Sequence, residues 1–319
     1  MNILITSVGR RTKLIDYFKR EFKKVVVTDM SKYAPALYHA DKYYILPSIK
    51  NENYIKRLVE ICKKDKIVAI LSLIDPELEL LSKNKKIFES IGVKIIGSSY
   101  EISDICFDKW KMYNFLKENN FLTARTYNDL EHFKKEHLER KIGFPIILKP
   151  KNGSASIGVK KIDEMKELDY YWKIRKEEYI IQEFLEGEEI GCDVYTDLIS
   201  NEVVSIFTKR KISMRAGETD KSFSIKEYKL LELIEKFVSK LGTKGPIDID
   251  IFKVNNNYYI SEVNPRFGGG YLTAYECGVN FPKLIKNNLN NLVNPKNIGN
   301  YQENIVVLKC DDIVKIREI

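Results

Sequence analysis

The chain has 319 residues, of which 44% are hydrophobic and 31% are charged, with 16 Gly and 9 Pro. This composition excludes collagen-like, coiled-coil and disordered proteins and leaves room for two ordinary domains or three lobes around a shared cleft. The net charge is +8, but no block of five or six like charges occurs, so we expect no nucleic-acid partner.

The cysteines and the hydropathy pattern limit the cellular setting. The 5 Cys are widely spaced and form no CxxC pair, so neither a disulfide scaffold nor a zinc site is expected. No run approaches 18 apolar residues, and the N-terminus lacks the basic and apolar regions of a signal peptide. We therefore expect a cytoplasmic protein with reduced thiols and no membrane partner.

The first part of the chain alternates strand-like and helix-like segments. Residues 2–8 form an apolar run, residues 11–22 carry apolar side chains at helical spacing, and residues 24–28 are again strand-like. The alternation continues to a last strand at 93–96. Because a strand–helix–strand order builds a parallel sheet, we predict a Rossmann-like α/β domain over residues 1–97.

Polar residues follow the carboxyl ends of these strands, where open α/β sheets usually bind ligands. Only Gly9 stands in the first strand-to-helix turn, so the three-glycine dinucleotide fingerprint is absent and NAD is not predicted. Arg10 and Arg11 follow at the start of the helix, either as a site for a substrate anion or as solvated cations. Asp75, with Pro76 in the first turn, is predicted to cap the helix after it.

The middle of the chain supplies a candidate phosphate-binding loop. A strand at 144–149 ends in Lys149, and residues 151–158 follow as small residues flanked by lysines. Backbone N–H groups without bulky side chains can approach phosphate oxygens closely. The segment fails the P-loop pattern because its lysine stands one position late and Lys161 replaces the Ser or Thr that would hold magnesium. We predict a phosphate lid, with a plain flexible hairpin as the alternative.

The strongest pattern lies near the C-terminal end, in two strand-like segments separated by an asparagine-rich turn. Alternation places Asp248 and Asp250 on one face of the first segment, and Ile260, Glu262 and Asn264 on one face of the second. The turn favours a hairpin that brings Asp250 beside Glu262. Hard oxygen ligands in this arrangement suit Mg²⁺ held with substrate phosphates, and an ordinary polar sheet face is the alternative.

The order of these signals resembles that of the ATP-grasp superfamily, and most closely the stand-alone relatives of the carbamoyl-phosphate synthase large chain. The residues that carry the resemblance are, in chain order, Lys109, Lys149, the small-residue loop, Gln182-Glu183-Phe184-Leu185 with Glu189, Asp250, and Glu262-Val263-Asn264-Pro265-Arg266. The resemblance implies three parts: the Rossmann-like pre-ATP-grasp domain at 1–97, an ATP-grasp lobe with the phosphate-binding lid at 98–185, and a lobe with the metal-binding hairpin and the C-terminal segment at 186–319.

The resemblance also implies a role for each residue. ATP would be bound by residues of both lobes: Lys109, Lys149, Gly153, Ser154, Ser156, Gly158, Glu183, Phe184, Leu185 and Glu189. Two Mg²⁺ ions, for which Mn²⁺ could substitute, would be held by Asp250, Glu262 and Asn264. Arg266 would stabilise the charge on the transferred phosphoryl group. Arg210 and Lys211 could clamp a substrate carboxylate, or form only a basic strand edge.

The reaction that the resemblance implies is ATP-dependent activation of a small carboxylate, such as that of an amino acid, as an acyl phosphate. An amine would then displace phosphate, and the expected partners are a small-molecule carboxylate and a small-molecule amine. Carboxyphosphate chemistry with bicarbonate and a non-catalytic ATP-binding partner or sensor are the alternatives. A homodimer is one assembly that the sequence allows.

Overall fold

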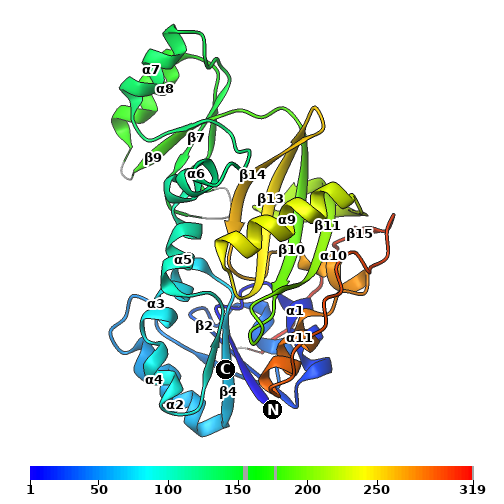
Figure 1. Cartoon of the computed structure of the whole chain (residues 1–319). Helices are drawn as coiled ribbons and strands as arrows, with labels where there is room; N and C mark the ends of the chain where they lie inside the picture. Colours follow the sequence, from blue (N-terminus) through cyan, green and yellow to red (C-terminus); the bar gives the residue numbers. More distant parts are fainter. Residues whose placement is uncertain (154–156, 176–177, 318–319) are drawn as a thin grey trace.

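The computed structural model describes residues 1–153, 157–175 and 178–317. Three sheets of five, six and four strands organise this part of the chain. Figure 1 shows the five-stranded sheet at the bottom of the view, the four-stranded sheet at the top and the six-stranded sheet between them on one side. The predicted combination of a parallel α/β domain with α+β lobes is confirmed. No described helix combines the length and the apolar character that crossing a bilayer requires.

The five-stranded sheet is wholly parallel, with the strand order β3-β2-β1-β4-β5. Its strands are β1 (Asn2–Thr6), β2 (Lys24–Asp29), β3 (Lys42–Ile45), β4 (Ile67–Ser72) and β5 (Lys94–Ile96). One face packs on α1 (Thr12–Glu21) and the short helix η1 (Pro35–His39), and the other on α2 (Tyr54–Asp65), α3 (Asp75–Lys83) and α4 (Lys85–Glu89). Because helices cover both faces, the central strands are continuous apolar runs, as the alternation of segments predicts.

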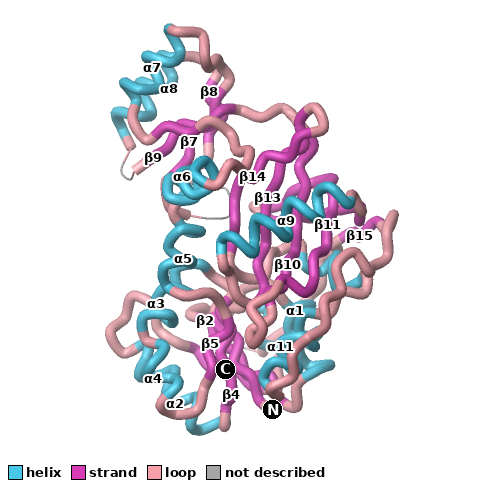
Figure 2. The backbone as a smooth tube through the Cα atoms, viewed as in Figure 1, coloured by secondary structure: helices cyan, strands magenta, loops and turns pink. Residues whose placement is uncertain are grey.

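The four-stranded sheet is antiparallel and forms a small lobe with its own hydrophobic core. Its strands are β6 (Thr126–Tyr127), β7 (Ile146–Pro150), β8 (Lys160–Ile162) and β9 (Tyr179–Glu183). The helices α7 (Leu130–Leu138) and α8 (Met165–Ile174) pack on it through buried Phe133 and Leu168. Figure 2 shows α5 (Tyr100–Phe107) and α6 (Lys109–Glu118) leading from the first sheet to this lobe.

The six-stranded sheet is antiparallel, with the order β14-β13-β10-β11-β12-β15. Its strands are β10 (Glu188–Thr196), β11 (Val203–Arg215), β12 (Glu218–Ile225), β13 (Gly245–Val254), β14 (Asn257–Asn264) and β15 (Val306–Leu308). Helix α9 (Tyr228–Leu241) covers the apolar face of this sheet, and α10 (Tyr271–Glu276) and α11 (Phe281–Leu289) follow β14. The opposite face of β10, β11 and β13 carries charged side chains.

The five-stranded and six-stranded sheets share one hydrophobic core. Phe18 of α1 meets Phe267 edge-on, with ring centroids 5.7 Å apart. Tyr17 stacks on Tyr275 with centroids 3.6 Å apart. Such aromatic pairs contribute beyond their buried area, so they fix α1 against the segment that follows β14. The two larger sheets therefore form one body, whereas the small lobe has a separate core.

Asp65, at the end of α2, joins the two strands β2 and β3 through a buried carboxylate. It accepts hydrogen bonds from Lys24 Nζ at 2.8 Å, Lys42 Nζ at 2.9 Å and Tyr44 Oη at 2.6 Å. Burial raises the pKa of Asp65, but the hydrogen bonds from Lys24, Tyr44 and Lys42 outweigh burial and hold the pKa well below its ordinary value. The ionised carboxylate is therefore part of what stabilises the first domain.

We expect Asp65→Asn to lower the free energy of unfolding by about 2 kcal/mol at pH 7, because two ammonium groups lose a buried anionic partner. Since the folded-state pKa is depressed, this stabilisation is present above the unfolded pKa and is lost as the pH falls through the folded one. Urea unfolding of both proteins should therefore show a smaller difference at acidic pH. An equal difference at both pH values, or a similar loss in the exposed control Asp163→Asn, would contradict this role.

Candidate active site

A cavity of about 510 Å³ lies where the small lobe, the six-stranded sheet and the N-terminal domain meet. Several residues singled out from the sequence line it: Lys109, Lys149, Gly153, Glu189, Lys211, Asp250, Glu262, Asn264 and Arg266. They come from α6, β7, β10, β11, β13, β14 and the segments beside them. The fold therefore gathers residues that lie up to about half the chain apart in sequence.

The hairpin of β13 and β14 is confirmed, and Asp250 pairs directly with Glu262 across it. The face predicted for Ile260 is wrong. The register shifts between Asp250 and Ile251, so that Ile260 lies opposite Ile251 and Ser261 is the extra residue of a bulge. Ile260 is consequently buried on the side of α9, whereas Glu262 lines the cavity.

Lys211 lies between two of the carboxylates on this sheet. Its Nζ donates to Glu189 Oε1 and to Asp250 Oδ1, each at 2.6 Å. Burial lowers the pKa of Lys211, but Asp250 and Glu189 outweigh burial and raise it above its ordinary value. Lys211 thus neutralises charge beneath the cavity and holds both carboxylates in place, which is a different arrangement from the predicted clamp on a substrate.

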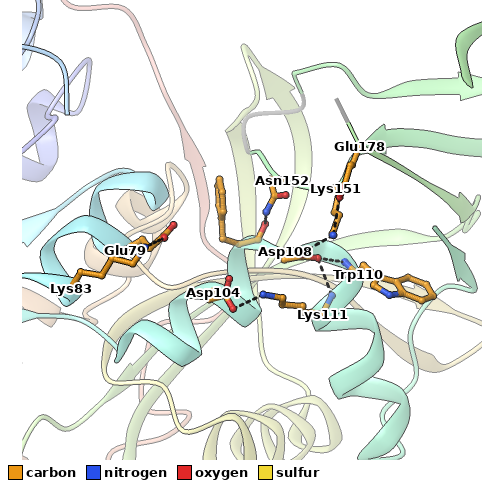
Figure 3. A network of polar contacts seen from close by, with 10 residues as sticks. Glu79, Lys83, Asp104, Asp108, Trp110, Lys111, Lys151, Asn152 and Glu178 are labelled. Atoms are coloured by element: carbon orange, nitrogen blue, oxygen red, sulfur yellow. Dashed lines mark hydrogen bonds and ion pairs between the residues drawn. The ribbon is translucent and has the colours of Figure 1, made fainter. Parts of the chain in front are cut away.

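The start of α6 is fastened to the end of β7 by polar contacts, shown in Figure 3. Asp108 caps α6 by accepting from the backbone N–H groups of Trp110 at 2.9 Å and Lys111 at 3.0 Å. Lys151 lies 3.4 Å from Asp108 and 2.9 Å from Glu178. The backbone N–H of Lys109 also donates to the carbonyl of Lys151 at 3.0 Å. These contacts set the direction in which the side chain of Lys109 projects from the start of α6.

Lys109 and Lys149 place two positive charges on the cavity wall. Lys109 Nζ donates to the carbonyl of Gly153 at 2.6 Å and lies 3.3 Å from Glu262 Oε1. Lys149 is buried, and none of the residues that the structure describes forms a hydrogen bond or ion pair with its ammonium group. Burial lowers the pKa of Lys149 to about 8, against the opposing effect of Glu262. A buried ammonium group at a cavity wall suits binding of an anion such as phosphate.

The donor set fits Mg²⁺ held together with a nucleotide. Asp250 and Glu262 offer carboxylate oxygens, and Asn264 offers an amide oxygen that also accepts from Arg266 at 3.1 Å. Within the described ranges, no cluster of three or more His, Cys, Asp or Glu has the arrangement of a metal site. Mg²⁺ demands about six oxygen ligands, so phosphates and water would have to complete its shell. The chemistry therefore favours a metal that binds with its substrate.

Arg210 lies outside the cavity, on the opposite face of β11 from Lys209 and Lys211. Its side chain is 50% exposed, and its Nε lies 3.1 Å from Glu188 Oε1. Successive side chains of a strand point to opposite faces, so Arg210 and Lys211 cannot share one site. The prediction of a joint Arg210–Lys211 clamp does not fit this placement.

Of the segment predicted to border adenine, one residue lines the cavity. Gln182 lines the cavity, whereas Glu183, Phe184 and Leu185 do not. The backbone N–H of Glu183 donates to the carbonyl of Arg125 at 2.8 Å, so that donor is used inside the small lobe. Gly158 packs against Pro150 and is not among the cavity residues. Ser154 and Ser156 lie outside the described residues.

An ion pair between the first domain and the segment 262–266 was missed by the sequence reasoning. Arg266 Nε donates to Asp75 Oδ2 at 3.0 Å, and both side chains are buried. Asp75 is the first residue of α3 and the cap position is Ile74, so the predicted capping role is wrong. Its Oδ1 is buried without a partner in the described structure. No local sequence pattern predicts a contact between residues that lie 191 positions apart.

Comparisons with known proteins agree with this geometry. A family model described as "ATP-grasp domain" matches residues 106–270, and one described as "PylC-like, N-terminal domain" matches residues 3–96. The carbamoyl phosphate synthase large chain of a Thermoanaerobacter strain is 29% identical over 197 residues, which cover 55% of this chain and 17% of that protein. The chain thus spans about a sixth of the length of that relative.

Other relatives are covered more fully. The D-alanine–D-alanine ligase of Fervidobacterium nodosum is 30% identical over 270 residues, which cover 74% of this chain and 84% of that protein. The biotin carboxylase domain of Hydrogenobacter thermophilus 2-oxoglutarate carboxylase, a dimer in complex with MgADP, ADP and bicarbonate, has a similar fold. Its TM-score is 0.74 at 15% identity, over 95% of this chain and 73% of that chain. This chain belongs to the ATP-grasp family.

Proposed function

We propose that this protein is an ADP-forming ligase that joins a small carboxylate, such as that of an amino acid, to an amine. The observation that carries the proposal is the cavity wall on which Asp250 and Glu262 face each other while Lys109 and Lys149 approach from α6 and β7. Opposite charges around one cavity suit a triphosphate that binds with a metal ion. The similarity to a D-alanine–D-alanine ligase supports the same class of reaction.

The residues divide into three groups around ATP. Lys109 and Lys149 would bind the phosphates, because both line the cavity. Gln182 would border the adenine and Glu189 the ribose, because both line the cavity. When bound, Mg²⁺ would neutralise phosphate oxygens at the predicted metal ligands Asp250, Glu262 and Asn264, and Mn²⁺ would be an alternative ion.

The proposed reaction has two steps. A carboxylate oxygen of the first substrate attacks the γ-phosphorus of ATP, and ADP leaves. The amine nitrogen then attacks the carbonyl carbon of the acyl phosphate, phosphate leaves, and the nitrogen loses a proton. The chain contributes mainly by positioning and by electrostatic stabilisation. In this scheme Arg266 positions Asn264, to which it donates a hydrogen bond. The homodimer remains a prediction.

The test is ADP release by the purified chain with MgATP and single small carboxylates, bicarbonate included. We expect release that depends on one organic carboxylate, and formation of its hydroxamate when hydroxylamine replaces the amine. The hydroxamate arises because a free acyl phosphate reacts with this nucleophile. Release with bicarbonate alone would replace the proposal by carboxyphosphate chemistry. MgADP binding without turnover on any carboxylate would replace it by a nucleotide-binding role.

A further inference from the structure

A second cavity, of about 430 Å³, adjoins the first and is bounded by the start of α1, the glycine loop 268–270 and the C-terminal segment 307–314. The residues common to both walls are Arg10, Arg11, Glu218, Thr219 and Gly269. The two cavities therefore meet at one junction, and the second lies beyond the region proposed for ATP. Its volume exceeds that of a single small organic substrate.

Two cations meet at this junction with only one carboxylate between them. Arg11 Nη2 lies 3.4 Å from Glu218 Oε1, and Lys309 Nζ lies 3.7 Å from Glu218 Oε2. Both distances exceed those of good hydrogen bonds. The Nε of Arg11 is buried and has no hydrogen-bond partner in the described structure. One carboxylate thus faces two cations, which leaves a positive charge and an unused donor at the junction.

The surroundings of Lys309 agree with a shortage of negative charge. Burial lowers the pKa of Lys309, Glu218 opposes this effect, and Lys209 and Arg11 lower the pKa further. Burial likewise lowers the pKa of Arg11, and Arg266 acts in the same direction, whereas Glu218 and, more weakly, Asp75 and Asp248 oppose both. A second anion beside Arg11 and Lys309 would relieve the repulsion between them. Asp220 also acts on Lys309 in the opposing sense, but it pairs with Arg215 at 3.2 Å.

The C-terminal segment that carries Lys309 is held firmly across the cavity. Strand β15 pairs with β12, and the backbone N–H of Lys309 donates to the carbonyl of Asp220 at 3.0 Å. Further along, the guanidinium of Arg215 donates to both carboxylate oxygens of Asp311, at 3.2 and 2.8 Å. A bidentate pair of this kind fixes orientation as well as distance. These contacts therefore fix the backbone of Lys309 beside the junction.

The glycine loop explains why the junction has room. A Cβ on Gly269 would lie 2.6 Å from Glu218 Cδ, and a Cβ on Gly270 would lie 2.6 Å from Lys209 Cε. Only glycine allows the loop to lie this close to charged side chains. Beyond the loop, the apolar and aromatic residues Leu14, Tyr17 and Tyr271 line the cavity. Charged side chains, among them Glu276 and Asp312, line it there as well.

We propose that the second cavity binds the organic substrate of the ligase, that this substrate carries a carboxylate held between Arg11 and Lys309, and that an α-amino acid fits the site. The inference rests on the proposed function and adds the place and the chemical class of the substrate. Lys309 is a specificity-determining residue here. It comes from a segment beyond residue 270, where the match to the ATP-grasp family model ends.

The test compares Lys309→Met, Lys309→Arg and the control Lys315→Met, an exposed lysine of the same segment that does not line the cavity. Each protein is given MgATP and the standard amino acids singly at about 10 mM, which is above ordinary KM values. We expect ADP release with at least one amino acid, a roughly tenfold rise in its KM in Lys309→Met, and recovery in Lys309→Arg, because one charge-assisted contact is lost and restored. The affinity for MgADP, measured by calorimetry, should be the same in all variants, which also shows that they fold.

The outcomes separate the two proposals. ADP release with an amino acid and an unchanged KM in Lys309→Met would overturn the second-cavity site and leave the ligase function intact. Release only with carboxylates that are not amino acids would overturn the substrate class. If no carboxylate stimulates release, calorimetric titration of the MgADP complex with the same amino acids decides the inference by itself. Binding that weakens in Lys309→Met would support the site, and no binding would overturn it.

Discussion

Glu262→Gln should abolish carboxylate-dependent ADP release, with a loss on the order of 10³-fold or more in kcat/KM. Glu262 faces Asp250 across the hairpin and lies 3.3 Å from Lys109 Nζ, so its charge serves both the proposed metal ions and the phosphate-binding lysine. The amide keeps the shape of the side chain but removes the negative charge, so the fold should persist. Steady-state ADP release over a Mg²⁺ titration measures the effect, and more Mg²⁺ should restore only part of the rate.

The matched control is Glu235→Gln, because Glu235 lies on α9, pairs with Lys296 and lines no part of the cavity. Its activity and Mg²⁺ dependence should match those of the unaltered protein. Thermal unfolding of both variants checks that neither loses its structure. Near-normal turnover in Glu262→Gln would remove this residue from the proposed metal site and, with it, the assignment of the hairpin as that site.

Lys149→Met should weaken MgADP binding by roughly 100-fold, because a buried charge-assisted contact with phosphate is lost while the length of the side chain is kept. A pH effect should accompany it in the unaltered protein. The pKa of Lys149 is lowered to about 8, and phosphate binds the ammonium form. The affinity should therefore be full below that pH and fall by up to tenfold per unit above it, because binding then requires uptake of a proton.

Calorimetry across this pH range measures both effects. Lys134→Met is the control, because Lys134 belongs to the same lobe, pairs with Asp169 at 2.9 Å and does not line the cavity. It should keep both the affinity and the pH dependence. In Lys149→Met the affinity should be low and nearly independent of pH through this range. An unchanged affinity would place the phosphates away from β7, whereas a weakened affinity with the pH dependence retained would assign that dependence to another group.

Short-range patterns gave a reliable account of individual elements. The alternation of apolar and polar residues placed Asp248 and Asp250 on one face of β13, and the asparagine-rich turn favoured the hairpin that pairs Asp250 with Glu262. The same rule also shows that Arg210 and Lys211 point to opposite faces of β11, a signal that the prediction of a joint clamp overlooked. Strand faces and turns depend on residues that are neighbours in the chain, so they can be predicted from the sequence.

The bulge at Ser261 could not be predicted from such local patterns. A bulge depends on the register between two strands, and the face of Ile260 changes when one residue is inserted. The partner strand β13 thus decides which side chains of β14 face the cavity.

The sequence by itself determined the order of the elements, the faces of the strands where no bulge interrupts them, and the residue types that a nucleotide and a metal ion need, because these follow from backbone periodicity and side-chain chemistry. Only the tertiary structure decided that Arg266 meets Asp75 and that Lys309 joins Arg11 beside Glu218. Contacts between such distant residues arise when whole sheets and segments pack together, and no local pattern encodes the outcome.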